Sequence, residues 1–166
     1  MEMRSIKLVI ETLNQAGIRY IIVGGLAVNA HGYFRVTNDL DLVVSLEPAN
    51  ITAALHALDR IGFRPKLPIS PEQFANKALR ESWIRDKNMV VFQLWSDNHL
   101  RTPIDIFVME PFLFPEEAAR AIHQEIYPGV TAPFVSLQTL LAMKHRASRT
   151  KDLLDIETLR KLHPDA

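Results

Sequence analysis

The stretch Tyr20–Val44, which reads YIIVGGLAVNAHGYFRVTNDLDLVV, decides the fold of this chain. The run Arg19–Val23, at the start of this stretch, is rich in β-branched and aromatic residues and predicts a buried strand. Gly24–Gly25 follow at once and lead into LAVNAH, which predicts one or two turns of helix closed by Gly32. The last part, Asn38–Val44, predicts a second strand. This alternation of strand, helix and strand is typical of an α/β (α+β) domain.

Two carboxylates, Asp39 and Asp41, lie on the second of these expected strands. Side chains alternate between the faces of a strand, so both are expected on the same face, opposite the intervening Leu40. Two carboxylates this close repel each other in partly buried surroundings, which raises one pKa or requires a cation. Such oxygen ligands suit Mg²⁺, which binds one or two carboxylates and leaves positions for substrate phosphates.

The glycine turn predicts a phosphate-binding position beside these acids. Gly24–Gly25 place bare backbone N–H groups at a helix N-terminus, which is a favourable place for an anion. A third acid, Asp105, lies between Ile104 and Ile106 in a strand-like run. An acid in such a position costs free energy unless it is paired or bound to a metal. Together these features predict nucleotide chemistry.

The pattern formed by Gly24–Gly25, residues 26–38 and Asp39–Leu42 resembles the signature of the nucleotidyltransferase superfamily typified by DNA polymerase β. In that signature the second glycine position is more often serine. The resemblance implies a nucleotidyltransferase fold, with a mixed β-sheet, flanking helices and a C-terminal helical pair. It also implies two Mg²⁺ ions, for which Mn²⁺ can substitute. The implied catalytic and metal-ligating residues are Asp39, Asp41 and Asp105.

A second cluster lies near the C-terminus, where Lys144 is followed by the segment RTKDLLD, residues 149–155. From the residues alone, Asp152 stabilises a helix start and Asp155 pairs with Arg149 or Lys151. The alternative is that cations placed against the helix dipole are there to bind phosphate.

Arg35 and Thr37 precede the aspartate pair, and Arg35 fits a triphosphate ligand and an ion pair with an acidic neighbour equally well. With the C-terminal cluster, this arrangement resembles the nucleotidyltransferase toxins of type IV toxin–antitoxin (abortive infection, AbiEii-like) systems. That resemblance implies a cognate antitoxin as a partner. The nucleotide-binding residues that it implies are Gly24, Gly25, Arg35, Thr37, Lys144, Lys151 and Asp152.

The other elements follow from helical and strand patterns. Ser70–Gln73 has the form of a capping box and predicts a helix that continues to about Leu79 or beyond. Met89–Trp95 and Pro103–Met109 predict a hairpin. The basic residues Lys77, Arg80, Arg85 and Lys87 are expected on a solvated helix face; the alternative is a rim that meets a phosphate-bearing acceptor. Residues 1–166 are predicted to form a single nucleotidyltransferase domain, with a catalytic core at about 18–110 and a C-terminal helical part at about 136–162.

The composition of the chain excludes or disfavours several classes of protein. The net charge is zero, which argues against a dedicated nucleic-acid binder. The chain contains no cysteine, which rules out a thiolate metal site. No apolar stretch approaches the roughly 20 residues of a membrane span and the N-terminal MEMRSIK lacks a signal-peptide pattern, so a cytoplasmic protein without a membrane partner is expected.

The sequence thus predicts a Mg²⁺-dependent enzyme that moves a nucleoside monophosphate from an NTP to an acceptor hydroxyl and releases pyrophosphate. It leaves the acceptor open between RNA such as tRNA, a protein and a small molecule such as an antibiotic. One alternative is a non-catalytic, nucleotide-binding or regulatory relative of the same fold. Another is a structural or interaction module in which the acidic residues are incidental.

Overall fold

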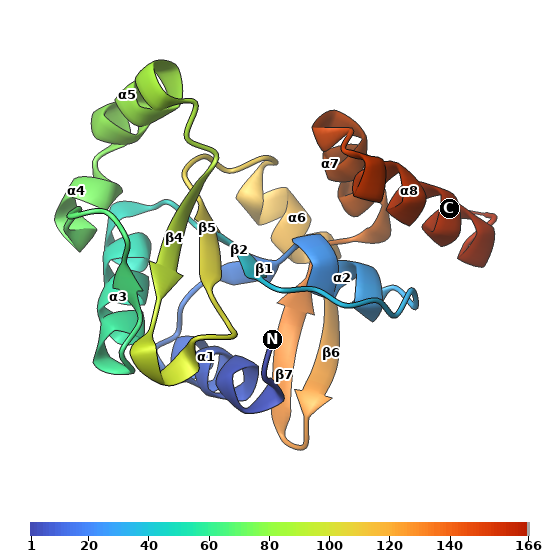
Figure 1. Cartoon of the computed structure of the whole chain (residues 1–166), viewed down its shortest axis with the longest axis horizontal. Coiled ribbons are helices and arrows are strands. Elements are labelled where there is room, and N and C mark those ends of the chain that lie inside the picture. Colours follow the sequence, from blue (N-terminus) through green and yellow to red (C-terminus); the bar gives the residue numbers. More distant parts are fainter. Residues whose placement is uncertain (166) are drawn as a thin grey trace.

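The structure, a computed structural model, describes residues 1–165 and is built on one seven-stranded mixed sheet in the order β3-β4-β5-β2-β1-β7-β6 (Figure 1). This confirms the predicted mixed α/β fold. The strands are β1 (Tyr20–Ile22), β2 (Leu40–Val44), β3 (Arg64–Pro65), β4 (Val91–Trp95), β5 (Ile104–Phe107), β6 (Ile122–Tyr127) and β7 (Val130–Phe134). The helices are α1 (Met3–Gln15), α2 (Gly24–Ala30), α3 (Pro48–Arg60), α4 (Pro71–Ala75), α5 (Lys77–Lys87), α6 (Phe114–Arg120), α7 (Leu137–Ala147) and α8 (Thr150–Leu162), with a 3₁₀ turn η1 (Asp97–His99).

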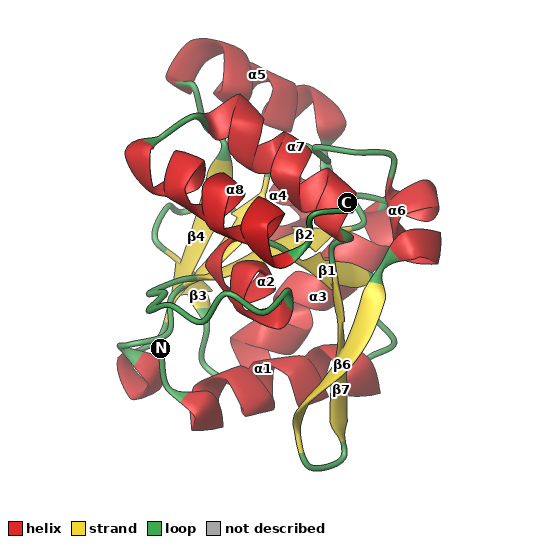
Figure 2. Cartoon of the chain, turned by 90° about the vertical axis from the view of Figure 1, so that its right-hand side faces the viewer, coloured by secondary structure: helices red, strands yellow, loops and turns green. Residues whose placement is uncertain are grey.

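Helices lie at both ends of the molecule. Helix α1 lies at the opposite end from α7 and α8, which pack against each other (Figures 1 and 2). Ser136 caps α7 by accepting a hydrogen bond from the N–H of Thr139, so the predicted C-terminal helical pair is present. Among residues 1–165, none of the helices combines the length and the apolar character that a membrane crossing needs.

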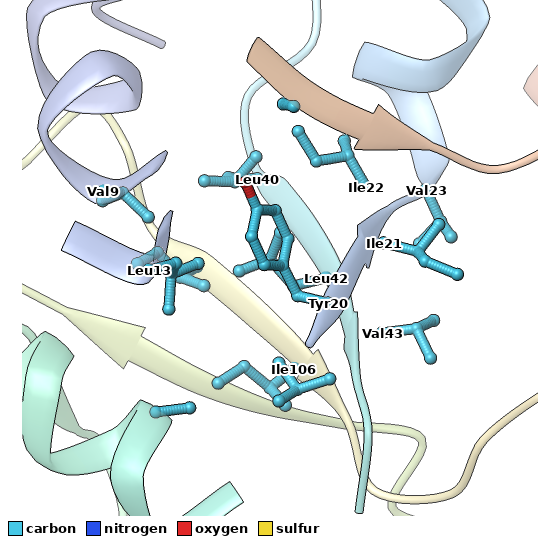
Figure 3. Packing of buried hydrophobic residues seen from close by; sticks show 14 of the residues in the cluster. Val9, Leu13, Tyr20, Ile21, Ile22, Val23, Leu40, Leu42, Val43 and Ile106 are labelled. Carbon is cyan, nitrogen blue, oxygen red and sulfur yellow. The ribbon is translucent and has the colours of Figure 1, made fainter. Parts of the chain in front are cut away.

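The core fixes which way the central strands face. Val9 and Leu13 of α1 lie on one side of β1 and β2, close to Leu42 (Figure 3). Leu40, Leu42, Ile104 and Ile106 are fully buried. Each such side chain contributes about 1.5–3 kcal/mol when it is buried, so a register that buried the aspartates instead is strongly disfavoured. Because side chains alternate, the aspartates of β2 and β5 point to the opposite face.

Strand β2 begins at Leu40, so the expectation of a strand from Asn38 is wrong. The ladder with β5 ends where the N–H of Leu40 donates to the carbonyl oxygen of Pro103 at 2.9 Å. Pro103 has no N–H to continue the pairing. Asp39 therefore precedes the strand, and strand alternation does not determine where its side chain points.

The helix that starts at Ser70 is shorter than expected, and its predicted capping box is present. It stops at Ala75, because Asn76 adopts an extended conformation and its side chain accepts a hydrogen bond from the N–H of Leu79 at 3.1 Å. An asparagine in this role ends one helix and caps the next.

Arg80 does not lie on a solvated face, which corrects the expectation for the basic residues of α5. Its side chain is only 6% exposed. The guanidinium donates hydrogen bonds to the carbonyl oxygens of Phe74 at 2.6 Å and Val108 at 3.1 Å, and it lies over the Phe74 ring. Arg80 thus joins α5 to α4 and to the end of β5.

Candidate active site

Asp41 and Asp105 are neighbours on the exposed side of the central strands. They are register partners in the parallel pair β2–β5, and neighbouring strands lie about 4.8 Å apart. Burial and, to a smaller extent, the charges of Asp105 and Asp39 together raise the pKa of Asp41 to about 6. Burial also raises the pKa of Asp105, with a smaller contribution from Asp39. The charge of Asp39 therefore raises the pKa of both of the other sequence-predicted carboxylates.

The chemistry of these carboxylates fits a hard divalent cation. They offer only oxygen ligands, and none of the three forms an ion pair with another residue of 1–165. A bound cation would remove the repulsion that raises the pKa of Asp41. Among residues 1–165, no three His, Cys, Asp or Glu side chains lie together in an arrangement that could hold a metal ion.

Gly24 is required by the close approach of Asp41. Its φ of +66° lies in the left-handed region, and a Cβ atom there would lie 1.9 Å from Oδ2 of Asp41. The backbone N–H of Gly25 faces the Asp41 carboxylate and lowers its pKa, which opposes the rise caused by burial. The glycine turn and strand β2 are therefore packed as one unit.

Gly25 makes room for the loop that precedes β2. A Cβ atom at this position would lie 2.3 Å from Oγ1 of Thr37 and 3.3 Å from Nη1 of Arg35. The loop alternates, with Arg35 and Thr37 half-buried against the turn and Phe34 and Val36 exposed. The Thr37 hydroxyl thus fills the space that a side chain at position 25 would occupy, which accounts for glycine at this position.

Gly25→Ser should therefore destabilise the chain, by about 1–3 kcal/mol as in other overpacked sites. Truncation of the neighbour in Gly25→Ser/Thr37→Ala should recover part of this loss. Urea unfolding of the two single variants and the double variant measures both effects. A Gly25→Ser protein as stable as the wild type would contradict the packing described for the turn.

A buried network of charges joins the loop to the two C-terminal helices. Nζ of Lys144 lies 2.7 Å from Oδ2 of Asp155 and 3.1 Å from Oδ1 of Asp152. Arg35 binds Asp155 through Nε at 2.7 Å and Nη2 at 2.8 Å, and Nε of Arg149 lies 2.6 Å from Asp152. The expected pairing of Asp155 with Arg149 or Lys151 is wrong, because Asp155 lies on the buried face of α8, toward Lys144 and Arg35.

Both carboxylates of the network are ionised. Burial favours a higher pKa for Asp152, but hydrogen bonds from Arg149 and Lys144 outweigh it, and the pKa is lowered. The pKa of Asp155 is lowered in the same way, since hydrogen bonds from Arg35 and Lys144 outweigh its burial. The charge of Lys144 also lowers the pKa of Asp41, so the network lies near that carboxylate.

The structure thus brings together nearly all of the sequence-predicted site residues. Asp41 contacts the Gly24–Gly25 turn, and Arg35 connects that turn to the C-terminal cluster. Lys151 is different, because it is exposed on α8 and forms no ion pair with another residue of 1–165.

Gln93 of β4 is a site residue that the sequence reasoning missed. Its Nε2 donates a hydrogen bond to Oδ1 of Asp105 at 2.8 Å, and the two are register partners. Burial of Phe92 and Leu94 turns Gln93 toward the aspartates. A glutamine between two apolar residues of a strand next to an acidic strand was the available signal.

Gln93→Ala should lower kcat on the order of tenfold and leave the KM for the NTP unchanged, because Gln93 orients Asp105 and lies away from the glycine turn. The hydrogen bond from Gln93 lowers the pKa of Asp105, so its loss should move the acidic limb of the pH–rate profile to higher pH. Steady-state kinetics from pH 5 to 9 measures both effects. A lower kcat with an unmoved profile would contradict the assigned role.

The raised pKa of Asp41 predicts the pH dependence of stability without ligands. Its folded pKa of about 6 exceeds the ordinary value, so the folded state binds more protons and the free energy of unfolding falls as the pH rises from about 4 to 6. Asp41→Asn should remove this fall and stabilise the metal-free protein at pH 7 by roughly 1–3 kcal/mol. Urea unfolding in EDTA at pH 4.5 and 7 measures it. Equal stability of both proteins at pH 7 would contradict a buried, ionised Asp41.

No protein-family model and no curated protein sequence matches this chain. Solved structures are similar to it in fold. The lincosamide antibiotic adenylyltransferase LnuA, bound to lincomycin, is 13% identical with a TM-score of 0.62 over 96% of both chains. ANT(2″)-Ia in complex with adenylyl-2″-tobramycin is 13% identical, with a TM-score of 0.59 over 96% of this chain and 87% of its own.

A putative nucleotidyltransferase from Thermotoga maritima is also 13% identical, with a TM-score of 0.57 over 98% of this chain and 92% of its own. At such low identity these similarities establish the architecture. The chain has the fold of the nucleotidyltransferases.

Proposed function

We propose that this protein transfers a nucleoside monophosphate from an NTP to an acceptor hydroxyl and releases pyrophosphate. The observation that carries the proposal is the packing of Asp41 against the Gly24–Gly25 turn, with Asp105 as its register partner. This arrangement places acidic groups beside a backbone turn in a sheet whose fold is that of nucleotidyltransferases.

Asp39, Asp41 and Asp105 would hold the divalent metal, which we propose to be two Mg²⁺ ions with Mn²⁺ as a substitute. When bound, the metal supplies neutralisation of phosphate charge and a lower pKa for the acceptor hydroxyl. Asp105, whose Oδ1 accepts a hydrogen bond from Gln93 at 2.8 Å, would act beside this hydroxyl as a metal ligand or as the base that takes its proton. The hydroxyl oxygen then attacks the α-phosphorus, and the bond from the α-phosphorus to the pyrophosphate oxygen breaks.

The phosphates of the NTP would lie between the glycine turn and the C-terminal network. Three cations, Arg35, Lys144 and Arg149, share two carboxylates there, which leaves a net positive charge. Asp152 positions Lys144 and Arg149. Gly24, Gly25 and the hydroxyl of Thr37 complete this side, and Lys151 would reach it from the outer face of α8. Catalysis then comes mainly from positioning and charge neutralisation.

The acceptor remains open between RNA, a protein and a small molecule. LnuA and ANT(2″)-Ia are antibiotic-modifying enzymes, which supports a small-molecule hydroxyl. The type IV toxin branch, with its cognate antitoxin, stays a prediction that rests on the motif around Arg35 and Thr37 and on the C-terminal cluster.

Pyrophosphate release tests the proposal. Each of the four NTPs is incubated with Mg²⁺, wild-type protein and a panel of acceptors that includes tRNA, lincomycin and tobramycin. We expect pyrophosphate release that requires Mg²⁺ and an acceptor. Tight binding of an NTP with no release for any acceptor would favour the non-catalytic relative instead.

A further inference from the structure

A row of polar residues crosses the adjacent strands β4, β5 and β2 and extends to Lys66, which directly follows the last residue of β3. The N–H of Lys66 donates to the carbonyl oxygen of Gln93 at 3.2 Å, which continues the β3–β4 pairing by one residue. Gln93 is the register partner of Asp105, and Asp105 is the register partner of Asp41. Residues paired in this way present their side chains to the same face of a sheet. The row therefore runs Lys66, Gln93, Asp105, Asp41.

The two ends of the row face different parts of the molecule. Asp41 lies against Gly24, where the NTP is proposed to bind. An acceptor whose hydroxyl meets Asp105 must leave that end free for the nucleotide. The rest of the acceptor then lies over β4 and β3, where it meets Gln93 and Lys66.

Lys66 is a free cation at this end. It is exposed and forms no ion pair within residues 1–165, whereas the nearby Arg64 is paired with Asp59 at 3.6 Å. The charge of Lys66 also lowers the pKa of Asp105, so its ammonium group acts on the proposed base. An ammonium group binds phosphate as a point charge. A phosphate monoester carries about −1.5 to −2 charge at pH 7, so it is attracted more strongly than a carboxylate with a single charge.

We propose that Gln93 and Lys66 form the acceptor subsite and that Lys66 selects an acceptor with a phosphate group close to the accepting hydroxyl. This inference rests on the proposed nucleotidyl transfer and assigns its substrate class. It predicts that a polycationic acceptor such as tobramycin, which ANT(2″)-Ia carries in adenylylated form, is disfavoured here.

Binding to the protein saturated with Mg²⁺ and a non-hydrolysable NTP analogue tests the inference. The probes are glucose 6-phosphate, glucose, tobramycin and a short single-stranded RNA with a 3′-hydroxyl. The proteins are the wild type, Lys66→Glu, and Lys161→Glu as the control with the same change in net charge on the exposed face of α8. Isothermal titration calorimetry gives each Kd.

We expect glucose 6-phosphate or the RNA to bind the wild type and Lys161→Glu alike, and to bind Lys66→Glu at least about tenfold more weakly. Binding of both probes assigns phosphate itself as the feature recognised, and binding of the RNA alone assigns a nucleic-acid acceptor. Glucose should bind less tightly than its phosphate, and tobramycin should not bind.

Two results would overturn the inference. One is that neither phosphate-bearing probe binds the wild type, and the other is that Lys66→Glu binds them as tightly as Lys161→Glu. The titration of the NTP analogue, run first in the same samples, separates this failure from that of the proposed function. If the analogue does not bind with Mg²⁺, both fail; if it binds, only the acceptor subsite is rejected.

Discussion

Asp41→Asn and Asp105→Asn should each reduce nucleotidyl transfer by about a thousandfold or more, while the fold remains intact. Each change removes a negative charge from the proposed metal-binding face and leaves the shape of the side chain almost unchanged. The structure supports folding of both variants, because relief of repulsion between register partners favours the folded state. Radiolabelled NMP transfer measures the activity, and circular dichroism with urea unfolding checks the fold.

Asp97→Asn is the matched control for this prediction. Asp97 is exposed on η1, and it lies outside the polar row, so its variant should keep the wild-type rate. If both Asp41→Asn and Asp105→Asn also transfer at the wild-type rate, the metal-site assignment is wrong.

Asp155→Ala should lower the free energy of unfolding by about 3–5 kcal/mol, the usual effect of removing one partner of a buried ion pair. Asp155 is 1% exposed and forms ion pairs with both Arg35 and Lys144. Its removal leaves Lys144 buried with one carboxylate and frees the loop that carries Arg35. Urea unfolding at pH 7 measures the change.

Glu157→Ala provides the comparison two residues further along α8. Glu157 forms an exposed ion pair with Lys161, and such pairs contribute only about 0–1 kcal/mol. A loss in Asp155→Ala no larger than that in Glu157→Ala would show that the network does not hold the C-terminal helices to the loop.

Local chemistry made much of this architecture predictable. The alternation of Leu40, Asp41 and Leu42 predicts which side chains of β2 point into the core. The apolar residues on either side of Asp105 do the same for β5. The C-terminal helical part expected at about 136–162 is formed by α7 and by α8, which ends at Leu162. Each of these features depends on residues that are neighbours in sequence.

The partners of Asp155 could not be predicted in this way. Arg35 lies 120 residues earlier in the chain, and no local pattern favours it over Arg149, which is nearer in sequence. Packing of α7 and α8 beside the loop decides the pairing. Arg80 is a similar case, since only the position of the Phe74 carbonyl oxygen turns its guanidinium inward.

Thermal unfolding of the wild type and Asp41→Asn with each of the four NTPs, with and without Mg²⁺, tests the central claim most directly. A ligand at 100 times its Kd stabilises a protein by about 2.7 kcal/mol, which raises the Tm by several degrees. The proposed site predicts a rise in the wild type that requires Mg²⁺ and is lost in Asp41→Asn. If no NTP raises the Tm of the wild type in Mg²⁺, the face formed by Asp41, Asp105 and the glycine turn is not a nucleotide site.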